Sequence, residues 1–374
     1  MLPFSKLSFW ERSIYTDGID FTIIGAGIVG MSTALHLRRA NPSAKIVLIE
    51  RGYLPTGAST KNAGFTCFGS PTELNDDLSK MDEGTVWDTV SMRMEGLREL
   101  FSLVDPERIQ YEACGSWDII HEEEESLTPD FLAYLNEKLF GISGENNVYT
   151  EDKTKLIDSG FSGVKTAYYN RLEGAIHTGK LIEELHRSCT NEGIQFLFGV
   201  NVLSFESYDS SVEIHTSMGQ LQTAKLLVCT NAFAKDYLSD IQAARAQVLV
   251  TKPISNLAVH GTFHMEAGYY YFRNVGNRLL FGGGRNLDFT GETSTEFETT
   301  LLIQEKLKQY LHELILPNTP VEIDYSWSGI MAVGSEKKPI IQKTNKNIAF
   351  GVRMGGMGVA IGASVGKQLS KIFS

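Results

Sequence analysis

The sequence has few cysteines, no long apolar run and no excess of basic residues. Its four cysteines are scattered along 374 residues without a C-x-x-C pair, which argues against a disulfide framework or a zinc site and favours a cytoplasmic protein. No apolar run approaches the roughly 18 residues of a membrane span, and the first residues lack a long apolar region of the signal-peptide type. The formal net charge of −11 argues against nucleic acid as a partner, because nucleic-acid binding needs basic patches.

Three glycines near the start of the chain follow the pattern G-x-G-x-x-G. They are Gly25, Gly27 and Gly30, within DFTIIGAGIVGMSTALHLRR at residues 20–39. The apolar residues before them predict a buried parallel strand, and those after them recur near helical spacing up to Asn41. In this strand–turn–helix context the glycines allow a tight turn, close approach of a pyrophosphate and close helix–strand packing. The pattern therefore predicts a dinucleotide site at the N-terminus of a helix.

An acidic residue ends the next predicted strand. Residues 45–49, KIVLI, lead into Glu50, which stands 20 positions after Gly30. A carboxylate at this place can accept hydrogen bonds from the two hydroxyls of a ribose. It favours an unphosphorylated ribose and disfavours NADP, but it leaves both NAD and FAD open.

Three later segments favour FAD over NAD. Residues 57–64, GASTKNAG, are mostly small and suit a backbone that passes close to a large planar ligand. Residues 174–238 predict an amphipathic helix, a second β unit and an apolar strand that ends at Thr230. Residues 347–373 predict a strand, a glycine-rich turn and a helix rich in small residues, whose N-terminus presents a second positive end to the cofactor.

Together these segments resemble the D-amino-acid oxidase-like (DAO) family of FAD-dependent oxidoreductases, which includes glycine oxidase, sarcosine oxidase and γ-glutamylputrescine oxidase. The resemblance covers about residues 18–373 and rests also on four segments in the family's order: RAQVLVTKP (245–253), YYYFRNVGNRLLFGGG (269–284), WSGIMAVGSEKKPII (327–341) and GGMGVAIGASVGK (355–367). It implies an α/β, Rossmann-like FAD-binding domain interleaved with an α+β substrate domain built on a mixed, mostly antiparallel sheet. We expect the FAD-binding parts at residues 1–97, 174–244 and 329–374, and the substrate-binding parts at 98–173 and 245–328.

The resemblance implies a set of residues around a non-covalently bound FAD. The three glycines hold the pyrophosphate, Glu50 binds the adenosine ribose, and Val202 contacts the adenine. Cys67 follows the flavin loop and is interpreted as a small buried hydrophobic residue rather than as an attachment point. The residues expected to contact the cofactor are Gly25, Ala26, Gly27, Ile28, Gly30, Glu50, Arg51, Ser59, Thr60, Lys61, Asn62, Ala63, Gly64, Val202, Thr230, Asn231, Ala232, Gly329, Gly355, Gly356, Met357, Gly358 and Val359.

The resemblance also implies the reaction, in which the substrate gives a hydride to the flavin. The expected substrate is a small amino acid or amine whose C–N bond is oxidised to an imine, which water then hydrolyses. An apolar, aromatic pocket favours the neutral, reactive amine over its charged form. Oxygen or another acceptor takes the electrons, and no metal is expected.

Candidate substrate contacts come mainly from YYYFR, residues 269–273. On a strand, Tyr269 and Tyr271 share one face, and the residues between and after them share the other. The resemblance places the first pair toward the flavin. His177, at the start of the segment that re-enters the cofactor domain, is a further candidate contact.

Two positions depart from the family's pattern. Members similar to glycine oxidase hold the substrate carboxylate with an arginine, whereas the corresponding position here is Met331. Arg353, before the terminal glycine turn, and Arg273, beside the tyrosines, are candidate replacements, because a bidentate arginine–carboxylate pair is strong and specific. Members similar to sarcosine oxidase activate oxygen with a lysine, where this sequence offers Leu280. The sequence therefore leaves oxidase and dehydrogenase activity both open.

Other functions fit the same fold. The main alternative is an FAD-dependent dehydrogenase of a 2-hydroxy acid or a polyol. A tRNA-modification flavoprotein is less favoured, because the negative charge and the absence of a basic tail argue against tRNA. A non-catalytic flavin- or NAD-binding protein is the last alternative. The sequence does not predict the substrate, the electron acceptor or the oligomeric state.

Overall fold

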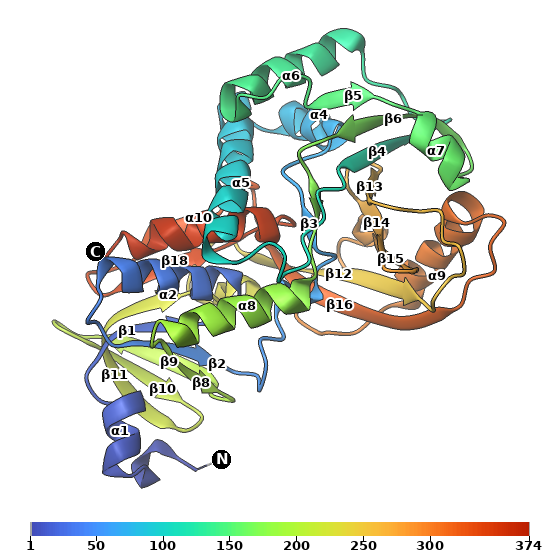
Figure 1. Ribbon diagram of the computed structural model, residues 1–374. Helices are drawn as coiled ribbons and strands as arrows, with labels where there is room; N and C mark the ends of the chain where they lie inside the picture. Colours follow the sequence, from blue (N-terminus) through green and yellow to red (C-terminus); the bar gives the residue numbers. More distant parts are fainter. Residues whose placement is uncertain (1, 374) are drawn as a thin grey trace.

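The computed structural model describes residues 2–373, except for the side chains at positions 155, 157 and 158. Two eight-stranded sheets lie in two lobes of the molecule (Figure 1). Met1 and Ser374, at the ends of the expected FAD-binding segments, lie outside the described residues. Within residues 2–373, no helix is long and apolar enough to span a membrane.

The first sheet is built around parallel strands. Its strands are, in spatial order, β17 (Ile340–Lys343), β18 (Ile348–Val352), β11 (Gly219–Val228), β1 (Ile19–Ile24), β2 (Ile46–Glu50) and β8 (Gln195–Phe198), with β10 (Val212–Thr216) on β11 and β9 (Val202–Ser207) on β10. β1 pairs in parallel with both β2 and β11, which agrees with the apolar runs of the sequence, because a strand covered on both faces is apolar on both. The β9–β10, β10–β11 and β17–β18 pairs are antiparallel.

Helices cover one face of the first sheet, and the strands β9 to β11 curl over the other (Figure 1). The covering helices are α2 (Ile28–Ala40), α8 (Thr178–Asn191) and α10 (Gly358–Ser370), with α5 (Glu83–Leu103) packed on α10. Ile23 and Leu48 point toward these helices, whereas Ile24 and Ile49 point to the opposite face, as the two-residue period of a strand requires. A Cβ atom on Gly366 of α10 would lie 2.8 Å from the backbone nitrogen of Thr33 in α2, so this helix pair needs small residues at its contact.

The second sheet is mixed and mostly antiparallel, which confirms the expected fold class. Its strands are, in spatial order, β16 (Ile323–Val333), β12 (Gln242–Thr251), β15 (Arg278–Gly283), β14 (Tyr270–Val275), β13 (Thr262–Met265), β4 (Ser116–His121), β6 (Val164–Asn170) and β5 (Tyr149–Glu151). Only the β13–β4 pair among these neighbours is parallel. The helix α9 (Leu301–Tyr310) covers one face, where Tyr270 and Phe272 are fully buried.

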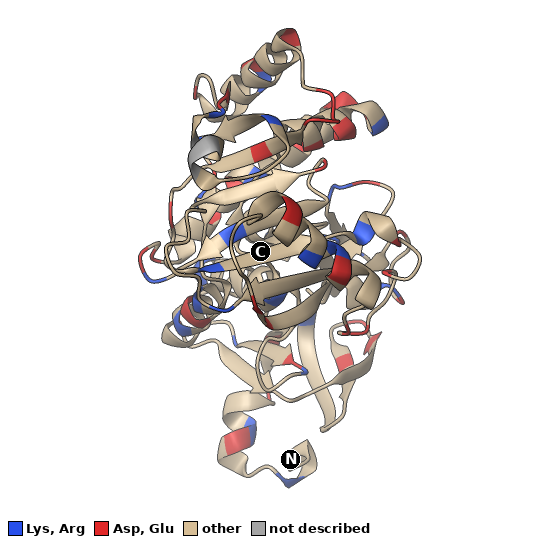
Figure 2. Cartoon of the chain, turned by 90° about the vertical axis from the view of Figure 1, so that its right-hand side faces the viewer, with Lys and Arg blue, Asp and Glu red and all other residues tan. Residues whose placement is uncertain are grey.

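The chain passes between the two sheets several times. β1 and β2 belong to the first sheet, β4 to β6 to the second, β8 to β11 to the first, β12 to β16 to the second, and β17 and β18 to the first. The remaining elements connect them: α1 (Phe9–Tyr15), α3 (Ala58–Lys61), β3 (Phe65–Thr66), α4 (Pro71–Lys80), α6 (Pro129–Ser143), α7 (Thr154–Ser159), β7 (Gly174–Ala175) and the short helical turns η1 (Phe4–Lys6), η2 (Asn231–Ala234), η3 (Arg285–Leu287) and η4 (Leu311–Ile315). Acidic and basic residues are interspersed along these elements rather than separated onto different sides (Figure 2).

Candidate active site

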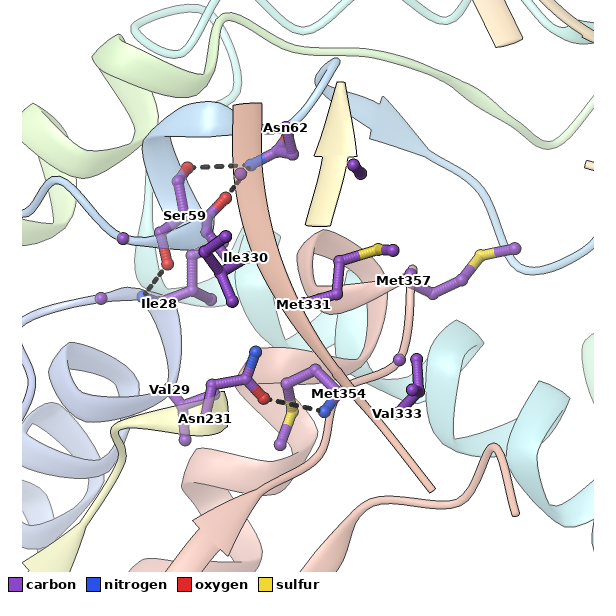
Figure 3. Close-up of a pocket in the computed structure, with 18 of the residues that line it drawn as sticks. Ile28, Val29, Ser59, Asn62, Asn231, Ile330, Met331, Val333, Met354 and Met357 are labelled. Atoms are coloured by element: carbon purple, nitrogen blue, oxygen red, sulfur yellow. Dashed lines mark hydrogen bonds between the residues drawn. The ribbon is translucent and has the colours of Figure 1, made fainter. Parts of the chain in front are cut away.

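A cavity of about 690 Å³ is lined by residues of both sheets. Its floor includes Ile24, Ile49 and Val228, which stand at the carboxyl ends of three neighbouring parallel strands. In open parallel sheets, ligands bind outside these strand ends. Figure 3 shows the part of the cavity that is framed by the start of α2, the helix α3, the strand β16 and the turn before α10.

The three glycines of the first turn have separate steric roles. Gly25 has a φ of +101°, and a Cβ atom there would lie 2.8 Å from the carbonyl oxygen of Cys229. A Cβ on Gly27 would lie 2.7 Å from Ser59 Oγ, and a Cβ on Gly30 would collide with the carbonyl oxygen of Gly25. Gly27 lines the cavity and is also the N-cap of α2. Because it has no side chain, it leaves the N-terminus of this helix accessible from the cavity.

Two helix N-termini open into the cavity. The N-cap residues of α2 and α10, Gly27 and Met357, make no side-chain hydrogen bond to their helices, and both line the cavity. The first backbone amides of a helix have no carbonyl partner within it, and the helix dipole makes this end positive. Two such ends at one cavity are a site for a ligand with several negative charges.

The segment that the sequence assigns to the flavin loop is held in place by side chains. Ser59 Oγ accepts a hydrogen bond of 3.0 Å from the Ile28 amide at the start of α2 (Figure 3). Asn62 donates to the carbonyls of Ala58 and Ser59 and accepts from the Gly64 amide, at 2.8–3.0 Å. Trp327 on β16 donates from Nε1 to the carbonyl of Lys61 at 3.0 Å. These bonds fix the backbone between the two helix N-termini.

Glu50 and Asn231 order the strand ends of the first sheet. The carboxylate of Glu50 accepts hydrogen bonds from the amides of Ala26 at 3.1 Å and Gly52 at 3.0 Å. Asn231 has a φ of +49°, and its Oδ1 accepts from the amides of Arg353 and Met354 at 3.1 and 3.2 Å (Figure 3). The carboxylate therefore stands beside the glycine turn, and the asparagine holds the turn that precedes α10.

Most of the residues expected to contact the cofactor do line this cavity. Those that line it are Gly25, Gly27, Ile28, Glu50, Arg51, Ser59, Lys61, Asn62, Ala63, Gly64, Val202, Thr230, Asn231, Gly329, Gly355, Gly356, Met357, Gly358 and Val359. The other four, Ala26, Gly30, Thr60 and Ala232, are not part of the lining. The two helix N-termini at the cavity and the glycine cradle that a Cβ on Gly27 would fill both fit FAD.

The substrate-side predictions divide into two groups. Tyr269, Tyr271 and Met331 line the cavity. Burial raises the pKa of Tyr271 to about 12, so its phenol is neutral near pH 7. His177, by contrast, is an exposed N-cap of α8 whose Nδ1 accepts from the Lys180 amide at 3.3 Å, and it is not part of the lining.

The two arginines expected near the substrate are engaged elsewhere. Arg353 has a φ of +64°, forms an ion pair with Asp240 and donates to the carbonyl of Lys338 at 2.8 and 3.0 Å. Arg273 donates from Nη1 to the carbonyls of Gly64 at 3.1 Å and Ile176 at 2.9 Å. Both guanidinium groups lie outside the cavity lining and join segments of the backbone.

A cluster of paired charges in the cavity wall, formed by two buried acids and a half-buried lysine, was not anticipated from the sequence. Lys337, in the loop after β16, forms ion pairs with Glu73 at 3.0 Å and Asp77 at 2.7 Å, one helical turn apart on α4. Burial raises the pKa of Glu73, but Lys337 and Arg93 outweigh it and lower that pKa to about 2. For Asp77, burial outweighs Lys337 and raises the pKa. Two acids four residues apart are the only sequence signal, and solvated helix faces carry the same spacing.

His264 on β13 is a second residue that the sequence did not indicate. It lines the cavity at 4% exposure, and its Nε2 has no hydrogen-bond partner among the described residues. Burial lowers the pKa of His264 to about 4, so its imidazole is neutral near pH 7. Glu173 lies behind it, with Oε2 at 3.9 Å from Nε2, and burial raises the pKa of this carboxyl to about 7. A short strand with one histidine carries no motif from which this could be predicted.

Comparisons with known proteins agree with the cavity's geometry. The model of the DAO family, FAD dependent oxidoreductase, matches residues 20–372. The chain is 21% identical to the probable oxidoreductase OrdL of Haemophilus influenzae, covering 94% of this chain and 82% of that protein, and 23% identical to the gamma-glutamylputrescine oxidoreductase of Escherichia coli, covering 94% and 83%. It is 24% identical to an L-2-hydroxyglutarate dehydrogenase of Indibacter alkaliphilus over 57% of this chain and 50% of that protein. The solved structure of glycine oxidase from Bacillus cereus superposes with a TM-score of 0.76 at 14% identity, covering 95% of this chain and 94% of the other. The chain belongs to the DAO family of FAD-dependent oxidoreductases, and its cofactor is FAD.

Proposed function

We propose that the enzyme oxidises the C–N bond of a small amino acid or amine, and that the resulting imine is hydrolysed by water. The observation that carries this proposal is a group of uncharged side chains in the lining, Tyr271, His264, Phe65 and Met331, beside the charges that Lys337 pairs. An ammonium group loses hydration in such a wall, which favours the neutral amine that can react. The match to the gamma-glutamylputrescine oxidoreductase along 94% of the chain supports the same substrate class.

The two sheets divide the work in this proposal. The segments 1–97, 174–244 and 329–374, which contain the strands of the first sheet, hold FAD through the residues named for the cofactor, and the segments 98–173 and 245–328 form the substrate wall. Bound FAD supplies the acceptor for the substrate's hydride. The residues of the chain orient the substrate and exclude water, and the N-terminus of α10 stabilises negative charge beside it.

FAD is bound without a covalent link in this proposal. Cys67 is 8% exposed, and its Sγ lies 3.4 Å from Met357 Sδ. Burial raises the pKa of the Cys67 thiol well above its usual range, which disfavours the nucleophilic thiolate. Electrons pass from reduced cofactor to oxygen or to another acceptor. Leu280, where some relatives carry a lysine, is 7% exposed in an apolar cluster with Val248.

A second candidate is an FAD-dependent dehydrogenase of a 2-hydroxy acid. The observation that favours it is the match to L-2-hydroxyglutarate dehydrogenases, although this covers only 57% of the chain. Oxidation of a hydroxyl group does not require a wall that disfavours ammonium. The amine proposal therefore accounts for the uncharged side chains of the site, and the hydroxy-acid proposal does not.

An anaerobic screen tests the proposal. The FAD-loaded protein is mixed with amines, amino acids and 2-hydroxy acids, and the absorbance of oxidised flavin is followed. We expect bleaching by at least one amino acid or amine. Bleaching by 2-hydroxy acids alone, or by none of these compounds, would refute the amine proposal.

A further inference from the structure

Six cationic side chains line the cavity, and two of them form ion pairs with acidic residues. Lys337 pairs with Glu73 and Asp77, and Lys80 pairs with Asp76 at 2.6 Å. Arg93 donates to the carbonyl of Phe68 at 2.9 Å within the same cluster. Arg51 and Lys61, which make no ion pair among the described residues, belong to the set assigned to the cofactor.

Arg285 is the remaining cation of the lining. It begins η3 directly after β15 and two glycines with φ of +127° and +78°, which turn the chain toward the cavity. Its guanidinium carbon lies 4.9 Å from the centre of the Phe289 ring. Its Nε is buried without a hydrogen-bond partner, and none of its guanidinium nitrogens forms an ion pair with the described residues.

The acids nearest in sequence are already used. Glu292 accepts from Arg245 Nε at 2.9 Å and Nη2 at 2.8 Å, and from Gln247 Nε2 at 2.9 Å. Asp288 accepts from the Gly291 amide at 2.8 Å. Arg285 is half-buried and its Nε lacks a hydrogen-bond partner, so an anion that enters the cavity gains a strong, charge-assisted partner there.

We propose that Arg285 binds a carboxylate of the substrate, so that the enzyme acts on an anionic amino acid and not on a simple amine. This rests on the proposed function, whose substrate class it narrows. Tyr269 packs on the same Phe289 ring, at 6.0 Å between ring centres, so Tyr269 and Arg285 belong to one wall of the cavity. Arg285 thus stands at a different place from Met331, where relatives similar to glycine oxidase carry their arginine.

The structure also explains why the other charges of the cavity do not oppose an anion. Glu73 and Asp77 lie beside two cations, Lys337 and Arg93, and Asp76 pairs with Lys80. Glu336 lines the rim and is exposed to solvent, which screens its charge. On the substrate wall, the charge without an ion-pair partner among the described residues is that of the half-buried Arg285.

The first test is a binding measurement on the FAD-loaded protein. Acetate and glutarate are titrated against their uncharged counterparts acetamide and glutaramide, and binding is read from the flavin absorbance spectrum and from the melting temperature. We expect each carboxylate to bind at least about tenfold more tightly than its amide, since hydrogen bonds to charged groups are the stronger ones. Equal binding of acid and amide by the wild-type protein would overturn the proposal.

Variants then locate the effect. Arg285→Gln is expected to weaken carboxylate binding about 10- to 100-fold and to leave amide binding unchanged, while Arg285→Lys retains part of the affinity as a point charge. Arg171→Gln is the control, because Arg171 lies outside the cavity lining in an exposed ion pair with Glu145. Unchanged carboxylate binding in FAD-loaded Arg285→Gln would refute the assignment. If Arg285→Gln does not retain FAD, the acid–amide comparison in the wild type and in Arg285→Lys decides.

Anaerobic reduction separates this inference from the proposed function. If no amine or amino acid bleaches the flavin, the proposed function fails, and the carboxylate site is judged by the binding titrations alone. The inference fails, and the proposed function stands, if decarboxylated amines bleach the flavin as efficiently as the parent amino acids and if Arg285→Gln does not change the KM of those amino acids.

Discussion

Arg245 and Glu292 form a buried ion pair whose disruption tests the packing behind the substrate wall. Their side chains are 7% and 2% exposed, and two hydrogen bonds of 2.8 and 2.9 Å join them. Arg245→Met leaves the Glu292 carboxylate buried without an ion-pair partner, and Gln247 and Thr300 remain as its hydrogen-bond partners. Breaking one side of a buried pair costs about 3–5 kcal/mol, so we expect the free energy of unfolding to fall by about that amount.

The assay is urea denaturation of the FAD-saturated protein, followed by circular dichroism. The double variant Arg245→Met/Glu292→Met removes both charges and should recover most of the loss, because apolar residues can replace a buried pair at little cost. Lys252→Met is the control: its pair with Glu322 is exposed, and we expect a loss below about 1 kcal/mol. A double variant as unstable as Arg245→Met would refute the explanation by an uncompensated charge.

Three further predictions concern the cofactor site and the buried acids. Gly30→Val should abolish FAD retention, since a Cβ there collides with the carbonyl of Gly25. Gly141→Ala, which has open space and lies outside the cavity lining, should bind FAD like the wild type. Equilibrium dialysis measures both affinities, and equal affinities of the two variants would contradict the steric argument. Burial raises the pKa of Glu173 from 4.5 to about 7, so its contribution to stability is fully present below about pH 4.5 and is lost as the pH rises to 7. In urea titrations, the free energy of unfolding of Glu173→Gln should therefore rise relative to that of the wild type between pH 5 and 7. A difference between the two proteins that does not change with pH would count against the shifted pKa. Acid precipitation of the wild type should release all flavin into the supernatant, and flavin left in the pellet would disprove non-covalent binding.

The cofactor half of the cavity could be predicted from the sequence because its determinants are local. The glycine turn, the strands on either side and Glu50 lie within about 30 consecutive residues, and each glycine has a steric reason that the pattern encodes. The two-residue period of β14 separates Tyr271, in the lining, from Tyr270 and Phe272, in the core. Tyr269 also lines the cavity, but it lies in the turn before β14 and not on the strand as predicted.

The substrate half could not be predicted in the same way, because it depends on contacts between distant segments. Arg353 stands beside the glycine turn in sequence, but its guanidinium pairs with Asp240. Arg285 has no such anion because Glu292, seven positions later, is held by Arg245 and Gln247 from another strand. The same contact gives a physical reason for the R-x-Q element in RAQVLVTKP: both side chains bind one carboxylate. His264 and Lys337 are likewise brought to the cavity only by the packing of the sheets.

The most direct test of the central claim is an anaerobic single turnover with product analysis. A primary amino acid that bleaches the flavin is mixed with the FAD-loaded protein, and the released products are quantified against reduced flavin. The account predicts one equivalent of ammonia and one of the corresponding oxo acid for each FAD reduced, as hydrolysis of an imine requires. Reduced flavin without ammonia, or oxidised flavin that persists with every amino acid and amine while 2-hydroxy acids bleach it, would contradict the account.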